Sequence, residues 1–232
     1  MGKHPDFDNL IDNFANLVMS TSTSPFVEYA LRNRSHILDV VKKFIFTTSD
    51  AEGMVLSVAE GTGAHSALFA DTFENLTFIP SEYDQDQLKT LDKNLNEWKN
   101  IKNAIRIDAS KPLTWNLEAE SFDMITCINM IHISPWECTI GLLKGANKCL
   151  KADGWLITYG PYAFDGKLYP ESNVEFNRSL KARNHLWGIR DVADIEKCAN
   201  KNGLSLKHKV PMPANNFCLL FQKVENSDNA KI

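Results

Sequence analysis

The stretch MVLSVAEGTGAH, residues 54–65, decides the fold. Its first six residues are apolar except for Ser57, and two closely spaced glycines, Gly61 and Gly63, follow. A short apolar strand that ends in a glycine turn and continues as a helix is typical of the first unit of a parallel α/β sheet. The dinucleotide fingerprint would place a third glycine or alanine at Ser66, so that match is partial. Taken alone, the turn could equally be a plain connector.

The same alternation continues toward the carboxyl end. Apolar strands are expected at 76–80, 104–107, 122–129 and 154–159, and helices at 84–98, 137–150 and 192–201. These strands have no polar face, which indicates a sheet covered by helices on both faces. The last two strands, expected at 204–210 and 217–223, are joined by a segment too short for a crossover helix, so they must be antiparallel. We predict an α/β fold whose mostly parallel, seven-stranded sheet ends in an antiparallel C-terminal hairpin.

Composition excludes several classes of protein. The formal net charge is -4 and no basic stripe is visible, so we expect no nucleic-acid partner. The five cysteines form no CxxC pair, which argues against a metal site and favours a reducing compartment. No stretch approaches the roughly 20 apolar residues of a membrane helix. The chain is therefore expected to be cytoplasmic, to act on a small molecule and not to bind membranes, with its oligomeric state left open.

Three consecutive strands end in residues suited to an adenosine ligand. The glycine turn closes the first strand, and Glu82, 19 residues after Gly63, closes the second. A carboxylate there suits the two ribose hydroxyls. Asp108 closes the third strand and could accept from an adenine amino group, or could instead make the turn before Ser110. The three features in this order are more specific than any one of them.

At this point the chain resembles class I methyltransferases, and more closely the methyltransferase-like protein 26 family, long catalogued as a domain of unknown function. The matching segments are RNRSHIL (32–38), AEGTGAH (59–65), PSE (80–82), CINMIHISPWE (127–137), GPY (160–162), LWGIRD (186–191) and MPANN (212–216). The resemblance implies a Rossmann-like class I methyltransferase fold that binds S-adenosyl-L-methionine. The candidate cofactor-binding residues are Glu60, Gly61, Thr62, Gly63, Glu82, Asp108, Ala109 and Asn129.

The chain departs from these relatives in its first motif. They usually carry an acidic residue where this chain has Ser57, and a small residue where it has Glu60. Either Glu60 substitutes for the missing acid from the loop, or cofactor binding is weak and the chain is a catalytically inactive binding protein.

The segment Asn129-Met130-Ile131-His132 follows the fourth strand, and the resemblance puts it beside the methyl donor. His132 is the candidate base because histidine titrates near neutrality. A histidine that only shapes the pocket is an equally good interpretation. The other candidate substrate residues are expected at the same edge: Met130, Trp136, Tyr159, Tyr162, Trp187, Arg190, Asn215 and Asn216. Aromatic walls could enclose a cation, and Arg190 could clamp a carboxylate or pair with an acid of the protein.

The expected organisation is an N-terminal helical extension (1–23), a methyltransferase domain (24–224) and a disordered tail (225–232). The expected function is S-adenosylmethionine-dependent methyl transfer to a small molecule. The alternative is an inactive methyltransferase-like protein that acts through a protein partner. A nicotinamide-dependent oxidoreductase is disfavoured by Ser66 and by the antiparallel hairpin.

Overall fold

A seven-stranded sheet runs through the computed structural model, which describes residues 25–224. Its strands are β1 (Gly53–Val58), β2 (Leu76–Glu82), β3 (Ile105–Arg106), β4 (Phe122–Ile128), β5 (Leu150–Gly160), β8 (Leu204–Met212) and β9 (Asn216–Lys223). They are ordered β3-β2-β1-β4-β5-β9-β8, and β9 is antiparallel to both of its neighbours, whereas the other pairs are parallel. The predicted sheet is confirmed. The expected extension (1–23) and tail (225–232) lie outside the described residues.

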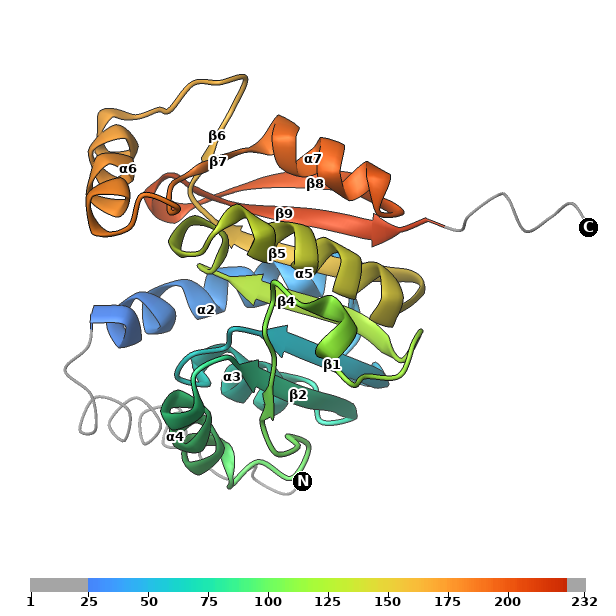
Figure 1. Ribbon diagram of the computed structural model, residues 1–232. Helices are drawn as coiled ribbons and strands as arrows, with labels where there is room; N and C mark the ends of the chain where they lie inside the picture. Colours follow the sequence, from blue (N-terminus) through green and yellow to red (C-terminus); the bar gives the residue numbers. More distant parts are fainter. Residues whose placement is uncertain (1–24, 225–232) are drawn as a thin grey trace, which may run out of the picture.

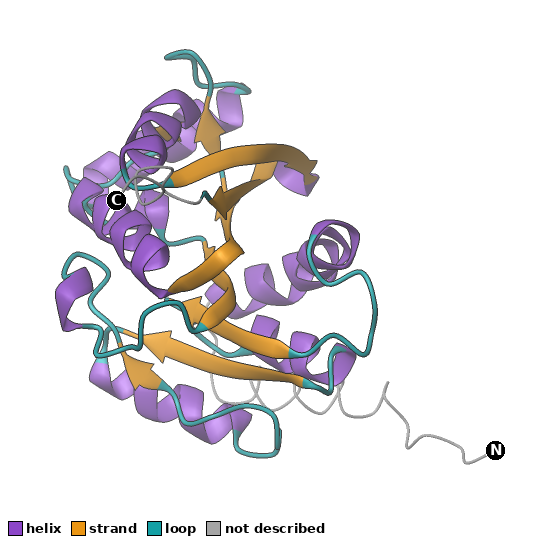
Figure 2. Ribbon diagram, turned by 90° about the vertical axis from the view of Figure 1, so that its right-hand side faces the viewer, coloured by secondary structure: helices purple, strands orange, loops and turns teal. Residues whose placement is uncertain are grey.

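Helices cover both faces of the sheet, as the uniformly apolar strands predicted (Figures 1 and 2). The helices α2 (Pro25–Phe44), α3 (Ala64–Thr72) and α4 (Gln85–Leu95) pack on one face, and α5 (Trp136–Cys149) and α7 (Val192–Lys201) pack on the other. Each face has its own apolar core, one around Phe69, Phe73 and Phe78 and the other around Ile125, Leu142 and Phe221. None of the helices within residues 25–224 is long and apolar enough to cross a membrane.

The segment between β5 and α7 holds the elements that the sequence did not predict. It contains α6 (Glu171–Arg183) and a small parallel pair of strands, β6 (Tyr162–Ala163) and β7 (Arg190–Asp191). Only Asn173 and Leu180 of α6 are buried, so this helix has no apolar stripe to reveal it. Short 3-10 turns occur at η1 (Pro112–Thr114), η2 (Ile131–Ile133) and η3 (Pro213–Asn215).

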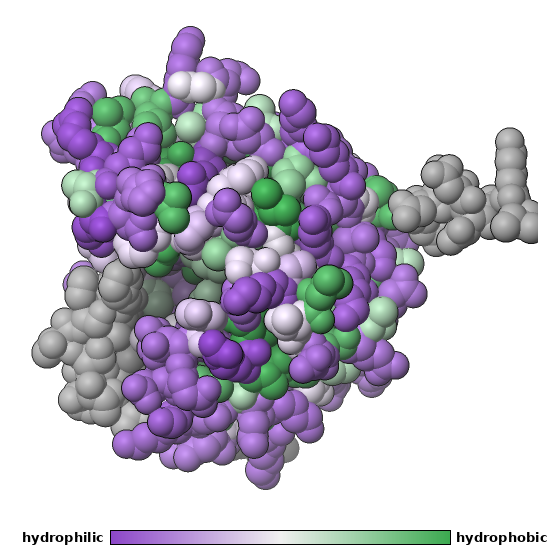
Figure 3. All heavy atoms as spheres, in the orientation of Figure 1, coloured by the Kyte–Doolittle hydropathy of each residue, from purple (hydrophilic) through white to green (hydrophobic). Residues whose placement is uncertain are grey.

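The strand order reverses between β1 and β4, which are neighbours in the sheet. In open α/β sheets a ligand binds beyond the carboxyl ends of the strands at such a point. These ends lie at the left of Figure 1, where α6 also stands. In the same view the surface is hollowed on that side (Figure 3).

Two glycines allow the segment after β3 to lie against α5. A Cβ at Gly141 would overlap the carbonyl oxygen of Ala109, and one at Gly145 would overlap the Trp115 ring. The Trp115 indole in turn donates a 2.9 Å hydrogen bond to the carbonyl of Asp108. Helix α5 therefore fixes the position of the loop that carries Asp108 and Ala109.

We expect Gly141→Ala to lower the free energy of unfolding by about 1–3 kcal/mol, because the added methyl overpacks a backbone contact. The better helix propensity of alanine, about 1 kcal/mol, does not offset this loss. Urea unfolding measures the effect. Lys144→Ala, at an exposed position of the same helix, should change stability by less than about 0.5 kcal/mol. Equal midpoints for the two variants would contradict the packing account.

Candidate functional site

The glycine turn follows β1 and has a left-handed backbone at three positions. Ala59, Gly61 and Gly63 have φ values of 56°, 69° and 90°. A Cβ at Gly61 would meet nothing within 4 Å, whereas one at Gly63 would come within 2.8 Å of the Leu95 side chain. Gly61 therefore faces open space that a ligand could occupy, and Gly63 allows α4 to pack against the turn. The sequence did not distinguish these two roles.

Glu82 ends β2 directly beside this turn. The backbone N–H of Gly61 donates to its Oε2 at 3.1 Å, and the N–H of Tyr83 donates to its Oε1 at 2.8 Å. The side chain is 9% exposed. Each carboxylate oxygen can accept a further hydrogen bond. Glu82 therefore holds the turn and still offers two acceptor oxygens next to the open space above Gly61.

Asp108 is engaged by its own loop. Its Oδ1 accepts from the Ser110 N–H at 3.0 Å and from the Ser110 hydroxyl at 2.6 Å, and Lys111 lies 3.2 Å from its Oδ2. Burial alone would raise the pKa of Asp108, but these hydrogen bonds and the lysine charge outweigh it, so the pKa lies below its usual value. This geometry corresponds to the alternative in which Asp108 makes the turn before Ser110. The neighbouring Ala109 is buried.

The carboxylate of Glu60 is buried and extends toward Ser57. Its Oε1 accepts from the Ser66 N–H at 2.9 Å. The Ser57 hydroxyl lies 3.3 Å from that of Ser66 and accepts from Thr126 at 3.0 Å. Burial raises the pKa of Glu60 to about 7, against hydrogen bonds from Ser66, Ser57 and His65. The Glu60 carboxylate therefore reaches the side chain at position 57 from the loop.

Glu60 is expected to make stability depend on pH. Its pKa is raised on folding, so its contribution is complete below the unfolded pKa of 4.5 and is lost as pH rises through about 7. Replacement by glutamine removes this ionisation, and the stability of Glu60→Gln relative to wild type should rise by about 2–3 kcal/mol between pH 5 and 8. Urea unfolding at both pH values measures the difference. A pH-independent difference between the two proteins would show that Glu60 does not titrate in this range.

Thr62 adds an unsatisfied polar atom to the turn. Its hydroxyl is buried and has no hydrogen-bond partner among the described residues. Its carbonyl accepts from the Asn94 amide at 3.0 Å, which ties α4 to the turn. The open space at Gly61 and the two acceptor oxygens of Glu82 together fit a polar ligand such as an adenosine moiety.

His132 lies just beyond β4, within η2. Its ring packs edge-on against Phe176 of α6, with the ring centroids 5.6 Å apart. A Cβ at Gly160 would lie 3.1 Å from its Nδ1, and its carbonyl accepts from the Gly188 N–H at 3.0 Å. Burial, with smaller effects of Arg183 and Arg190, lowers the pKa of His132 to about 4. The imidazole is therefore neutral at pH 7, but, contrary to the expectation from the sequence, it does not titrate near neutrality, because burial disfavours its protonated form.

The residues before His132 are fixed by the sheet. Asn129 has a φ of 60°, and its N–H donates to the Tyr159 carbonyl at 2.8 Å. Met130 is buried in the core that contains α5. The peptide of Asn129 thus continues the pairing of β4 with β5 and turns the chain toward His132.

Tyr159 belongs to a buried polar network that the sequence did not reveal. Burial raises the pKa of its hydroxyl, against hydrogen bonds from Asn33 and Asn216. Asn33, on α2, also contacts the Nε2 of His65 through its Oδ1 at 2.7 Å. Burial lowers the pKa of His65 to about 3. The only sequence signal for Asn33 was its place in the RNRSHIL segment, and the contacts link α2, the start of α3 and the C-terminal hairpin.

The other expected substrate residues do not form one wall with Tyr159. Tyr162 packs in the opposite core, and its hydroxyl donates to Thr158 at 2.9 Å. Arg190 donates to the carbonyls of Ser134 at 2.9 Å and Leu186 at 2.6 Å, and its guanidinium lies 5.9 Å from the Trp136 ring centroid.

Trp187 and Asn215 each contact a residue of α6. Arg183 lies 5.8 Å from the Trp187 ring centroid. Asn215 has a φ of 59° in the hairpin turn, and its carbonyl accepts from Asn173 of α6 at 3.4 Å. Within residues 25–224 no group of three or more His, Cys, Asp or Glu side chains could hold a metal ion.

The sequence profile of a family described as "Protein of unknown function (DUF938)" matches residues 24–223. The chain belongs to this family. The match covers nearly all of the described structure, so the glycine turn, Glu82 and His132 all lie within the DUF938 region.

Solved structures similar to this DUF938 chain carry methyltransferase names. A Galdieria sulphuraria protein provisionally named a sarcosine dimethylglycine methyltransferase has a TM-score of 0.66 and 14% identity, over 84% of this chain and 86% of its own. A Bacillus halodurans protein provisionally named a methyltransferase has a TM-score of 0.64 and 14% identity, over 84% of this chain and 100% of its own. An O-methyltransferase family protein from Burkholderia thailandensis has a TM-score of 0.70 and 14% identity, over 85% of this chain and 58% of its own. This chain therefore spans little over half of that neighbour's length. At such identities the likeness establishes the Rossmann-like methyltransferase fold.

Proposed function

We propose that this chain is an S-adenosylmethionine-dependent methyltransferase that acts on a small molecule. The observation that carries the proposal is the pairing of Gly61 with Glu82 across the ends of β1 and β2, beside open space. A carboxylate at this place suits the two ribose hydroxyls of an adenosine moiety. The motifs that resemble the methyltransferase-like protein 26 family, above all CINMIHISPWE and MPANN, support a place close to that family.

The residues of the turn and of the neighbouring strand ends would hold the cofactor. Glu82 would bind the ribose, and the Gly61 backbone would face the ligand. Asp108 and Ala109 would border the adenine, with Glu60 and Asn129 toward the methionine end. The bound cofactor supplies an activated methyl group, so the protein contributes chiefly positioning and the removal of a proton.

His132 would take that proton from the acceptor group. It is neutral at pH 7, and its pKa of about 4 makes it a weak base. Such a base suits an acceptor whose proton is weakly acidic and still present at pH 7, such as that of a thiol or a phenol. We propose that Tyr159, Asn215 and Asn216 contact this acceptor, whereas Met130 packs in the core on the other face of the sheet. The five free cysteines fit a reducing, cytoplasmic location.

The alternative function is an inactive methyltransferase-like protein that acts through a partner. Ser57 favours it, because the acid of related proteins is absent there and Glu60, with a pKa of about 7, is only partly ionised at neutral pH. Under this alternative the cofactor binds but no acceptor is methylated.

Calorimetric titration with S-adenosylmethionine, S-adenosylhomocysteine and NAD tests the proposal. We expect the first two to bind and NAD not to bind. Binding of NAD without binding of S-adenosylhomocysteine would contradict the proposal and would favour the oxidoreductase interpretation. Transfer of a labelled methyl group to any component of a metabolite extract then separates the enzyme from its inactive alternative.

A further inference from the structure

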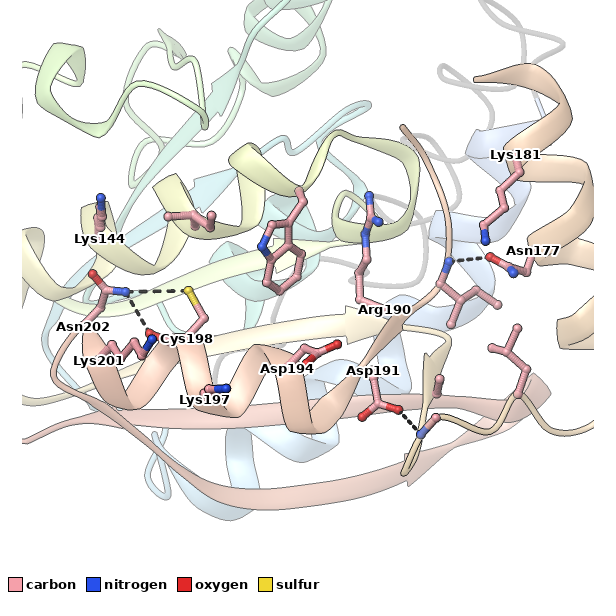
Figure 4. A pocket seen from close by; sticks show the side chains of 16 residues that line it. Lys144, Asn177, Lys181, Arg190, Asp191, Asp194, Lys197, Cys198, Lys201 and Asn202 are labelled. Atoms are coloured by element: carbon pink, nitrogen blue, oxygen red, sulfur yellow. Dashed lines mark hydrogen bonds between the residues drawn. The ribbon is translucent and has the colours of Figure 1, made fainter. Parts of the chain in front are cut away.

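A groove of about 950 Å³ lies between α5 and α7, outside the glycine turn and the His132 site. Figure 4 shows it running between the two helices toward α6. Residues at helical spacing line it: Trp136, Ile140 and Lys144 on α5, and Asp194, Lys197, Cys198 and Lys201 on α7. These two stripes face each other, and residues from the segment between β5 and α7 close the groove toward α6.

The rim of the groove is cationic, although the chain as a whole is acidic. Lys144, Lys181, Lys197 and Lys201 are exposed, and none of them forms an ion pair with another described residue. Arg190 adds a fifth positive charge.

Among the described residues two carboxylates line the groove, against five positive side chains, and Glu137 also acts on the charge of Arg190. Asp191 accepts from the N–H groups of Gly166 at 2.6 Å and Ala193 at 2.8 Å. The second is Asp194. The positive charge of the groove is therefore not neutralised by its own acids.

The floor of the groove is apolar. Ile140, Cys198 and Ile189 are partly buried there, and the Trp136 ring lies beside the Arg190 guanidinium. Arg190 keeps a buried Nε without a hydrogen-bond partner among the described residues. An apolar floor between cationic rims is amphipathic, and it complements a ligand with an apolar face flanked by negative charges.

We propose that this groove docks an acidic, amphipathic segment of a partner protein. Its lysines are spread along the rim from α5 and α7 to α6 and do not converge on one point, which would be needed to hold a single small anion. A small-molecule site also buries most of its ligand, whereas this groove is open to solvent along its rim. A segment with leucines at helical spacing and glutamates beside them would fill the floor and pair with the rim. The proposal does not depend on the proposed methyl transfer.

The test uses the full chain and a fluorescein-labelled peptide of about 14 residues with leucines on one helical face and glutamates elsewhere. A peptide with glutamine in place of every glutamate is its matched control. We expect the glutamate peptide to bind, as measured by fluorescence anisotropy, and salt to weaken that binding because exposed charge pairs are screened. The glutamine peptide should bind at least about tenfold more weakly, since several surface pairs of about 0.2–1 kcal/mol each are lost.

Variants locate the binding site. The double variant Lys197→Glu, Lys201→Glu should weaken glutamate-peptide binding by about tenfold or more, whereas Lys93→Glu, Lys99→Glu, which changes exposed lysines on and after α4, should leave it unchanged. Ile140→Gln should also weaken glutamate-peptide binding, because it places a polar side chain on the apolar floor of the groove. Circular dichroism and thermal unfolding show whether each variant is folded. Equal binding by both lysine pairs, or binding of inorganic tripolyphosphate at the groove without binding of the peptide, would overturn the proposal.

Discussion

Replacing His132 by alanine is expected to lower the rate of methyl transfer by about 10²–10⁴-fold, the range in which a general base contributes. The ring is held between Phe176 and Gly160 at the end of β4, and its pKa of about 4 keeps it neutral above pH 5. Cofactor affinity should stay unchanged, because His132 belongs to the acceptor side of the site. The measurement is single-turnover transfer of a labelled methyl group to the acceptor recovered from the metabolite extract.

His132→Asn is the control that separates proton transfer from simple orientation. Asparagine retains polarity but cannot take a proton, so it should not restore the rate. The rate of the wild-type protein should show no inflection from His132 between pH 5 and 8, because its pKa lies below that range. Full activity in the asparagine variant would show that His132 orients the acceptor and that no base is required there.

Glu82→Ala is expected to weaken S-adenosylhomocysteine binding by about 1.5–3 kcal/mol, which corresponds to about 10–150-fold. The alanine removes both acceptor oxygens from the ribose position and also leaves the N–H groups of Gly61 and Tyr83 without their acceptor. Calorimetric titration measures the loss. Thermal unfolding should show that the variant is folded, since the sheet pairing of β2 does not involve this side chain.

A conservative variant divides the two effects of Glu82. Glu82→Gln keeps one oxygen that can accept from Gly61 or Tyr83, but it loses the charge and one of the two acceptor oxygens. Its affinity should lie between those of wild type and the alanine variant. Wild-type affinity in a folded Glu82→Ala protein would remove Glu82 from the cofactor site.

The sheet was predictable because its physical signal is local. Apolar runs such as 122–129 lack a polar face, and the short link between the last two strands allows only a hairpin. The strand ends then follow from topology, which brings the glycine turn next to Glu82. Helix α6 has no apolar stripe and packs on few residues, so periodicity could not detect it.

The details of the site depend on packing that one sequence does not encode locally. The Leu95 side chain, 32 positions away, decides that Gly63 is a packing glycine and leaves Gly61 to face the ligand. The direction of the Glu60 side chain depends on the N-terminus of α3, and Asn33 reaches His65 only because α2 lies against α3. The expected aromatic wall divided because Tyr159 and Tyr162 lie on opposite faces of the sheet.

The most direct test of the cofactor site is a crystal structure of the chain with S-adenosylhomocysteine. We expect the ribose hydroxyls to lie within hydrogen-bond distance of the two Glu82 carboxylate oxygens, and the ligand to pass over the backbone of Gly61. The homocysteine end should point toward Asn129 and His132. A ligand bound anywhere else, for example in the groove between α5 and α7, or no ligand at all at saturating concentration, would contradict the account.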